Sequence, residues 1–547
     1  MPFIRKLFTV LTKAERKTLI VSIVIGGACI VAAVVIIILQ TTKSVPAIGG
    51  QFTEGIVGQP EYINPVTAQS ETDLAIVKLV YSNLQDIADK VQISPDGKTW
   101  TIRLKENLHW QDDAKLTSDD VIFTVQSIQN SDAASPLAAA WQGVTASRSS
   151  ELELQFSLAH PYAFFADNLK DLYILPKHLF ADTPPGNWRL SQYNSKPIGS
   201  GPYMFSSYDR QADGFIAGYH LAAWQGTGGP RALIKNFDFI FSTNQDGVIK
   251  NFNAGRIDAF VATPGDLALI ARPSKISSWH TTGYYAVFWN QGNNNALTDP
   301  AVRAALAIAV DRNALVDQAL GGHGAPDYGP IPPDATYAAP LFTTSSVSLA
   351  SATLDAGGWY VNGNNIREKI VQKATTTLSF TLTVPDIDFL VATAKLLQAS
   401  WYAIGANVTV ATDTPDHIAQ NQVVNRNYDG ILYGNVLGPN SDLSAFWNST
   451  GRFSPGKNLA LYANTTDDNL MATILTTLDD ATRTAMFAKL QNDIVAANPA
   501  VFLYSPDELY VTAGDVRGID TDVSLSGPSD RFRQIPQWYL NTTRVLK

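Results

Sequence analysis

The sequence predicts a mixed α/β protein preceded by one membrane-spanning helix. Three observations predict this fold class. Strand-like and helix-like segments follow one another without a repeat period, one long apolar segment lies near the N-terminus, and 45% of the 547 residues are hydrophobic. A chain with this much apolar surface can bury more than one core, which excludes a disordered chain. Because strands and helices do not alternate strictly, mixed sheets of the α/β or α+β type are expected.

The predicted membrane helix comes first. Residues 18–42 contain no charged side chain, and a helix over residues 18–40 is longer than the ~30 Å hydrocarbon core of a bilayer. The preceding residues 1–17 are basic, so the positive-inside rule places them in the cytoplasm and the main body outside, whether periplasmic or extracellular. An uncleaved anchor is predicted, with a cleaved signal peptide or a lipoprotein signal at Cys29 as the alternatives. Residues 41–50 are predicted to form a short linker.

Composition and motifs exclude several function classes. The net charge of −9 would repel phosphate backbones, so we predict no nucleic-acid partner. Cys29 is the only cysteine and the seven histidines are widely spaced, so we predict no disulfide, no metal and no cofactor. No serine-nucleophile elbow and no phosphate-binding loop occurs. We therefore predict that the protein is not an enzyme and has no catalytic residues. An anchored hydrolase that assembles its acids from distant positions is the alternative.

Local signals predict individual elements of the outer region. Residues 100–104 (WTIRL) alternate like a half-buried strand. Thr117 or Ser118 is placed to cap a helix whose apolar residues follow at helical spacing. The clearest helix is predicted over residues 300–320, where Asp299 would be the N-cap, a proline fills the first turn and two glycines follow the last.

Nine collinear segments resemble the family 5 extracellular solute-binding proteins, which include the peptide, dipeptide and nickel receptors of ABC importers. They lie at residues 58–84, 94–125, 175–179, 197–203, 252–258, 299–312, 354–359, 428–429 and 498–504. The most specific is residues 94–125 (SPDGKTWTIRLKENLHWQDDAKLTSDDVIFTV), which looks like the family's turn, strand, hairpin and helix start. Here Asp113 stands where glycine is usual, and Ser118 where alanine is usual.

The resemblance implies a periplasmic-binding-protein-like fold of the class II, cluster C type, in which two hinged lobes close on a ligand. By this analogy, residues 45–82, 196–275 and 506–547 form lobe I, residues 83–195 form an extra subdomain of that lobe, and residues 276–505 form lobe II. The pattern of strands and helices alone does not predict this arrangement.

The resemblance also implies a function. The protein would be a membrane-anchored, monomeric receptor that captures oligopeptides or dipeptides outside the cell. It would deliver them to an ABC permease whose ATPase subunits supply the energy. The alternatives are the same fold binding a non-peptide solute and a sensory receptor subunit that reports on ligand through a partner.

Family position suggests eight residues that contact the ligand: Gln69, Ser70, Trp141, Thr263, Tyr433, Asn435, Asn440 and Asp442. In relatives that bind peptides, an aspartate shortly after a Gly-Trp pair holds the peptide's α-ammonium group. Here Asn435 takes the place of the tryptophan, and Gly438 falls near the place of the aspartate. Asp442 is either the replacement for that aspartate or a helix N-cap. Trp141 is either a ligand-stacking or a core residue, and Asn435 and Asn440 are either ligand-binding or turn residues.

Overall fold

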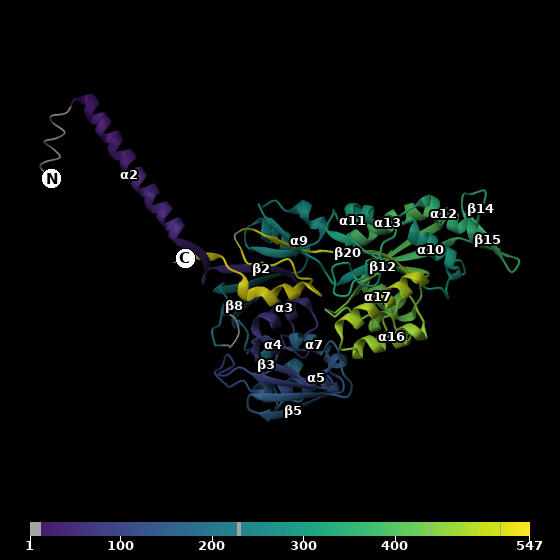
Figure 1. Cartoon of the computed structure of the whole chain (residues 1–547), viewed down its shortest axis with the longest axis horizontal. Helices are drawn as coiled ribbons and strands as arrows, with labels where there is room; N and C mark the ends of the chain where they lie inside the picture. Colours follow the sequence, from purple (N-terminus) through teal and green to yellow (C-terminus); the bar gives the residue numbers. More distant parts are fainter. Residues whose placement is uncertain (1–11, 227–230, 439, 515) are drawn as a thin grey trace.

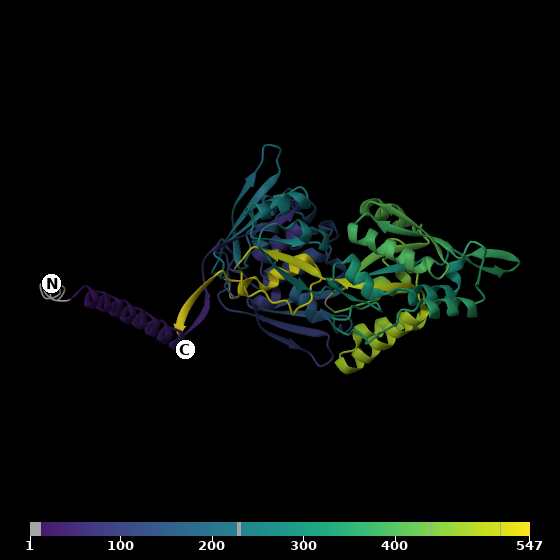
Figure 2. The ribbon, with the colours of Figure 1, turned by 90° about the horizontal axis from the view of Figure 1, so that it is seen from above.

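The structure is a computed structural model that describes residues 12–226, 231–438, 440–514 and 516–547. Residues 1–11 of the predicted cytoplasmic segment lie outside the described residues. The described chain forms a mixed α/β body from which one long helix projects (Figure 1). Two large sheets organise the body, and a second view shows them in two lobes that lie side by side (Figure 2).

A seven-stranded mixed sheet forms the first lobe. In sheet order its strands are β11 (Lys275–Trp279), β21 (Glu508–Thr512), β10 (Ala259–Ala262), β2 (Gln51–Val57), β9 (Asn236–Ser242), β8 (Ile216–Ala223) and β7 (Tyr203–Arg210). β2 is parallel to both of its neighbours, and the outer pairs are antiparallel. Helix α9 (Gln245–Asn253) packs on β2, and α3 (Glu71–Val80) packs on the 3-10 helix η8 (Pro528–Gln537). Phe52 contacts Phe237 in the core that α3 and η8 share, whereas the apolar residues of α9 form a separate core.

A six-stranded sheet forms the second lobe and is buried on both faces. In sheet order its strands are β13 (Gly324–Pro326), β20 (Ala500–Pro506), β12 (Gly283–Trp289), β19 (Gly430–Val436), β17 (Ser379–Pro385) and β18 (Asn407–Asp413). Successive side chains point to opposite faces, so Val287 and Trp289 of β12 join one core while Tyr284 and Phe288 join the other. The helices that cover these faces are α12 (Val347–Ala356), α13 (Asp388–Tyr402), α16 (Thr465–Thr476) and α17 (Asp480–Ala497), together with two described below.

A four-stranded antiparallel sheet bears out two local predictions. Its strands, in sheet order, are β3 (Ala88–Ile93), β4 (Thr99–Leu104), β6 (Glu153–Leu158) and β5 (Val144–Ser150). The predicted strand falls within β4, where alternate side chains are buried. Thr117 caps helix α5 (Ser118–Gln129) and forms a capping box with Asp120. At Asp113 the backbone φ is 66°, a left-handed conformation that explains why glycine is usual there.

The prediction of a single helix over residues 300–320 is wrong. The structure has two helices instead, α10 (Pro300–Ile308) and α11 (Arg312–Ala319). The predicted N-cap of α10 is confirmed, but Asp311 accepts a hydrogen bond from an amide in the first turn of α11 at 3.1 Å and so starts a second helix. The buried Arg312 donates from Nε to a carbonyl of β20 at 2.7 Å, which fixes the new direction.

Helix α2 (Lys13–Thr41) projects from the body and has no buried residue. Among the described helices, it is the one long and apolar enough to cross a membrane. It contains the predicted span at residues 18–40 and begins earlier, where Thr12 and Glu15 form a capping box.

The stretch predicted as a linker, residues 41–50, is largely a β-strand. β1 (Thr42–Ala47) follows α2 directly and pairs in antiparallel register with β22 (Asn541–Leu546). The C-terminus therefore lies at the base of α2 (Figures 1 and 2). Local sequence could not predict this strand, because its partner comes from the other end of the chain.

A small three-stranded sheet and several short helices complete the set of β-strands and α-helices in the described residues. These are strands β14 (Tyr360–Val361), β15 (Arg367–Val371) and β16 (Ala374–Thr377), and helices α4 (Leu84–Ile87), α6 (Ala138–Trp141), α7 (Phe165–Asp171), α8 (Lys177–Phe180), α14 (Pro415–His417) and α15 (Ser444–Trp447). The boundaries given above for the lobes and the extra subdomain stay a prediction.

Candidate functional site

Two adjacent crossovers join the seven-stranded sheet to the six-stranded sheet. β11 leads through residues 280–282 into β12, and β20 leads through Asp507 back into β21. The crossovers are tied together, because the Asp507 carboxylate accepts a hydrogen bond from the Ser278 hydroxyl at 2.8 Å and lies 3.0 Å from Nδ1 of His280. Short extended segments therefore connect the two lobes, which is the arrangement of a hinge.

A third segment, residues 524–533, runs beside the crossovers. The amide of Leu525 donates to the carbonyl of His280, and its carbonyl accepts a hydrogen bond from the amide of Thr282, both at 2.9 Å. The chain then continues into η8, which packs against α3 of the first lobe. The C-terminal part of the chain therefore borders the space between the sheets.

Three adjoining cavities lie there, and we name them together the interlobe cleft. Their volumes are about 380, 370 and 450 Å³, within the range of small-molecule sites. The first two share Pro506, Glu508 and Pro528, and the third shares Gly527 with the first and Glu71 with the second. The first and second cavities together have walls from both lobes, with β2 and β10 on one side and β12, β19 and α13 on the other. The third cavity is lined by α3, the loop before it, parts of the four-stranded subdomain and the C-terminal segment. A larger cavity of about 580 Å³ is lined by the four-stranded sheet and its loops alone, so lobe movement would not close it.

A buried ion pair lies on the first-lobe side of the cleft. The carboxylate of Glu54 on β2 is fully buried, forms a salt bridge with Arg531 of η8, and accepts a hydrogen bond from the Tyr510 hydroxyl at 2.7 Å. The guanidinium of Arg531 also lies 4.2 Å from the ring centroid of Phe532. The two charges compensate each other, so this pair holds η8 on the sheet rather than offering a free charge to a ligand.

Glu508, the first residue of β21, has no such partner. It lines two of the three cavities, and its Oε1 is buried without a hydrogen-bond partner among the described residues. Burial raises the pKa of Glu508 to about 7; Arg531 opposes this rise, and Glu71 and Glu54 add to it. A carboxyl group perturbed in this way in a cleft is a candidate for direct contact with a ligand.

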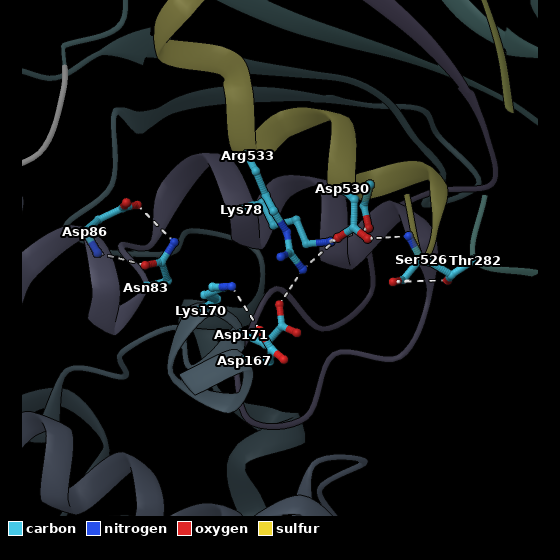
Figure 3. A network of polar contacts seen from close by, with 11 residues as sticks. Lys78, Asn83, Asp86, Asp167, Lys170, Asp171, Thr282, Ser526, Asp530 and Arg533 are labelled. Carbon is cyan, nitrogen blue, oxygen red and sulfur yellow. Dashed lines mark hydrogen bonds and ion pairs between the residues drawn. The ribbon is translucent and has the colours of Figure 1, made fainter. Parts of the chain in front are cut away.

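A network of charges fixes the C-terminal segment at the third cavity (Figure 3). Asp530 lies 2.6 Å from Nζ of Lys78 and 2.9 Å from Arg533, and it accepts a hydrogen bond from the amide of Ser526 at 2.9 Å. Arg533 also forms an ion pair with Asp171 of α7. Burial alone would raise the pKa of Asp530, but Lys78 and Arg533 hold this pKa below its usual value. Lys78 and Arg533 are therefore already paired with carboxylates of the protein.

Of the first-lobe residues predicted to contact the ligand, Gln69 and Thr263 line the cleft and Ser70 does not. Gln69 borders the third cavity and Thr263 the second. Ser70 is the N-cap of α3, where its hydroxyl accepts a hydrogen bond from the amide of Asp73 at 3.1 Å. Its position follows from helix capping.

The β19 residues Tyr433 and Asn435 both border the first cavity. Asn435 is a buried strand residue that donates from Nδ2 to the Tyr284 hydroxyl at 2.9 Å. It is therefore not the turn asparagine of the alternative interpretation. Its contact with a ligand stays a proposal.

Asn440 and Asp442 lie away from the three cavities. Asn440 donates to the Tyr162 hydroxyl at 3.3 Å, and Asp442 accepts a hydrogen bond from the amide of Ser444 at 2.8 Å, at the first turn of α15. The N-cap of α15 is Leu443 rather than Asp442, and this cap has no side-chain hydrogen bond, so the predicted N-cap role of Asp442 is not confirmed. Its role as an ammonium partner stays a prediction.

Trp141 is a core residue of the four-stranded subdomain. Its side chain is 2% exposed, and its ring meets those of Phe156 and Phe165 edge to face, each at a centroid distance of 5.5 Å. It does not border the interlobe cleft, so the stacking alternative has no support in the structure.

Replacing Trp141 by phenylalanine is expected to lower the free energy of unfolding by about 1–2 kcal/mol, because part of a packed ring is lost. Peptide affinity should stay the same. Denaturant unfolding and a binding titration of the same detergent-solubilised variant check both statements. A loss of affinity without a loss of stability would restore a ligand role.

The cleft residues that the sequence predictions missed are Glu54, Glu71, Glu508 and Arg531. They come from four elements that lie far apart in the chain, so no spacing motif connects them. One signal was present: Glu54 is the one charged residue of the strand QFTEGIV, and a buried charge requires a partner.

Comparisons with known proteins agree with this architecture. The profile of the bacterial extracellular solute-binding proteins, family 5, matches residues 84–456. Protein XP55 of Streptomyces lividans is 27% identical over 493 residues, which cover 86% of this chain and 86% of that protein. The oligopeptide-binding protein AppA of Bacillus subtilis is 23% identical over 516 residues, 90% of this chain and 92% of AppA.

Solved structures share the fold. The ABC transporter substrate-binding protein CtaP from Listeria monocytogenes matches with a TM-score of 0.78 and 23% identity, over 90% of this chain and 99% of CtaP. AppA in complex with a nonapeptide matches with a TM-score of 0.70 and 22% identity, over 91% of this chain and all of that chain. The predicted two-lobed fold class is confirmed.

Proposed function

Since the chain belongs to the bacterial extracellular solute-binding proteins, family 5, we propose that it is the membrane-anchored receptor of an ABC importer and that it binds peptides in the interlobe cleft. The observation that carries this proposal is a cleft walled by both lobes beside a two-segment hinge. A ligand that contacts both walls favours the closed arrangement, so binding shifts an existing equilibrium between open and closed forms.

The register of β19 supports a peptide as the ligand. β12 pairs with β19 over its whole length, whereas β17 pairs with it only at Gly430 and Ile431. The remaining β19 residues therefore have no strand partner on that side among the described residues, and those at 433–436 line the first cavity. An extended peptide could add there as a strand, held by main-chain groups that all peptides share. The relative AppA is named for oligopeptides and has been solved with a nonapeptide.

Helix α2 supports the membrane attachment. It is exposed along its whole length and apolar enough to span a bilayer. Anchoring would confine the receptor near its permease and raise the effective concentration of the pair. In this arrangement residues 1–17 face the cytoplasm, the body is a monomer outside the membrane, and the permease and its ATPases complete the importer.

A peptide mixture is expected to stabilise the detergent-solubilised chain, because a ligand at 100 times its dissociation constant adds about 2.7 kcal/mol to the free energy of unfolding. Thermal unfolding, with native mass spectrometry of the retained ligand, measures this effect. Replacing Ile387 by tryptophan should abolish it, because Ile387 is partly exposed in the first cavity. The matched control is Ile370→Trp, which changes an exposed residue of β15 outside the cleft. If no peptide shifts the wild-type transition, the peptide assignment is wrong.

A further inference from the structure

We propose that the interlobe cleft selects ligands that carry an organic cation, an ammonium or a guanidinium group, and that Glu508 binds this group. The inference rests on the proposed receptor function and names the chemistry of its ligand. The residues that carry it are Glu508, Glu71, Glu54 and Arg531.

Glu508 lies where the first and second cavities of the cleft adjoin. It lies at the end of one crossover, between Pro506 and the body of β21, and it belongs to the walls of the first and the second cavity. Its Oε1 is buried without a hydrogen-bond partner among the described residues. A buried acceptor without a partner carries a large desolvation cost. A donor brought by the ligand would remove this cost.

The surrounding charges require that this donor be positive. Glu54 on β2 and Glu71 on α3 line the second cavity together with Glu508, and both disfavour its ionised form; Arg531 on η8 lines the same cavity and is the cation that opposes them. Arg531 is already paired with Glu54. The neighbouring Asp507 is bonded to Ser278 and His280 on the crossover. The carboxylate of Glu508 therefore lacks a cation of its own, and an anionic ligand group would be repelled here.

The geometry points to an organic cation rather than a metal ion. Within the described residues, no group of three or more His, Cys, Asp or Glu side chains could hold a metal ion. Glu71 uses one carboxylate oxygen to accept a hydrogen bond from the amide of Ser529 at 3.0 Å. An ammonium or guanidinium group needs fewer converging oxygens than a metal, because it forms charge-assisted hydrogen bonds to single carboxylates.

Binding of a cation should depend on pH. Burial raises the pKa of Glu508 to about 7, so the group is partly protonated near neutral pH when no ligand is bound. A bound cation favours the ionised form and expels the proton. Affinity for a ligand whose cation stays protonated, such as a lysine side chain, therefore falls below pH 7, about tenfold for each pH unit, and levels off above it. An α-ammonium group has a pKa of about 8, so its affinity falls again at higher pH. A neutral ligand should show no such dependence.

Titration calorimetry of the detergent-solubilised full chain with five probes tests the proposal. They are trialanine, N-acetyl-trialanine amide, the same acetylated amide with lysine as its middle residue, its norleucine counterpart, and 1,4-diaminobutane. We expect the three amine-bearing probes to bind at least about tenfold more tightly than the two neutral probes. Comparison of free trialanine with the lysine peptide distinguishes an α-ammonium from a side-chain ammonium as the source of the charge.

The variant Glu508→Gln should remove this preference, and Glu106→Gln, at an exposed position of the four-stranded subdomain, should keep it. If Glu508→Gln does not fold, the wild-type chain's affinity for the lysine peptide, compared between pH 6 and pH 8, decides instead. Neutral peptides that bind as tightly as cationic ones, or a preference that survives Glu508→Gln, would overturn the inference and leave the receptor function standing. Binding of diaminobutane alone, lost in Glu508→Gln, would support the cation site and overturn the peptide assignment. If none of the five probes binds, both proposals fail.

Discussion

Replacing Arg531 by methionine is expected to lower the free energy of unfolding by about 3–5 kcal/mol, because the variant leaves a buried charge without its partner. Glu54 has no exposed surface, and its salt bridge to Arg531 and the hydrogen bond from Tyr510 are the contacts that compensate its burial. Once the guanidinium is gone, Glu54 must either ionise in an apolar core or take up a proton. Either event disfavours the folded state at neutral pH.

The double variant Glu54→Leu with Arg531→Met separates this effect from simple loss of packing. It removes both charges, so its stability should return to within about 1–2 kcal/mol of the wild-type chain. The matched exposed pair is Lys115 with Glu151, where Lys115→Met should cost less than about 1 kcal/mol. Guanidinium unfolding followed by tryptophan fluorescence measures all three. Equal losses in the single and the double variant would show that the charge is not the cause.

Gly199→Ala is expected to cost about 3 kcal/mol or more, at the upper end of overpacking effects. A Cβ at this position would lie 1.9 Å from the carbonyl oxygen of Val80, at the end of α3. The backbone cannot easily move away, because the amide of Gly199 donates to the side chain of Gln111 at 2.9 Å and the amide of Gly201 donates to the same Val80 carbonyl at 2.7 Å. This close approach requires glycine at position 199, in the segment 197–203 that resembles the family.

The matched control for Gly199→Ala is Gly186→Ala. A Cβ at Gly186 would lie 4.0 Å from its nearest neighbour, the carbonyl oxygen of Asp132, so the substitution should change stability by less than about 0.5 kcal/mol. The same unfolding experiment compares the two variants. A small cost at Gly199 would mean that α3 and the glycine segment can separate without loss.

The sequence predicted those parts of the fold that depend on neighbours in the chain. The strand around Trp100 and the cap at Thr117 follow from alternation and from the hydrogen bonds that a threonine makes to the next turn. The prediction of one long helix over residues 300–320 failed at Asp311, because the same capping chemistry can start a helix inside a stretch with helical apolar spacing. Nothing in the local pattern distinguishes a cap at a first turn from one between two helices.

The site was harder to predict, because its residues come together only in the folded chain. Resemblance located Gln69, Thr263, Tyr433 and Asn435 beside the cleft. It missed Glu508, whose importance arises from burial and from charges on other elements. A single carboxylate in a short strand has no distinguishing spacing, so its role became visible only with the cavity around it.

The pairing of β1 with β22 sets the order in which this protein can be completed. Thr42 directly follows α2, and its hydrogen-bond partner Arg544 is translated 502 residues later. β1 must therefore stay unpaired during synthesis of both lobes, until β22 has been made and can pair with it. The junction between helix and body consequently becomes rigid only after the ligand-binding body has been made.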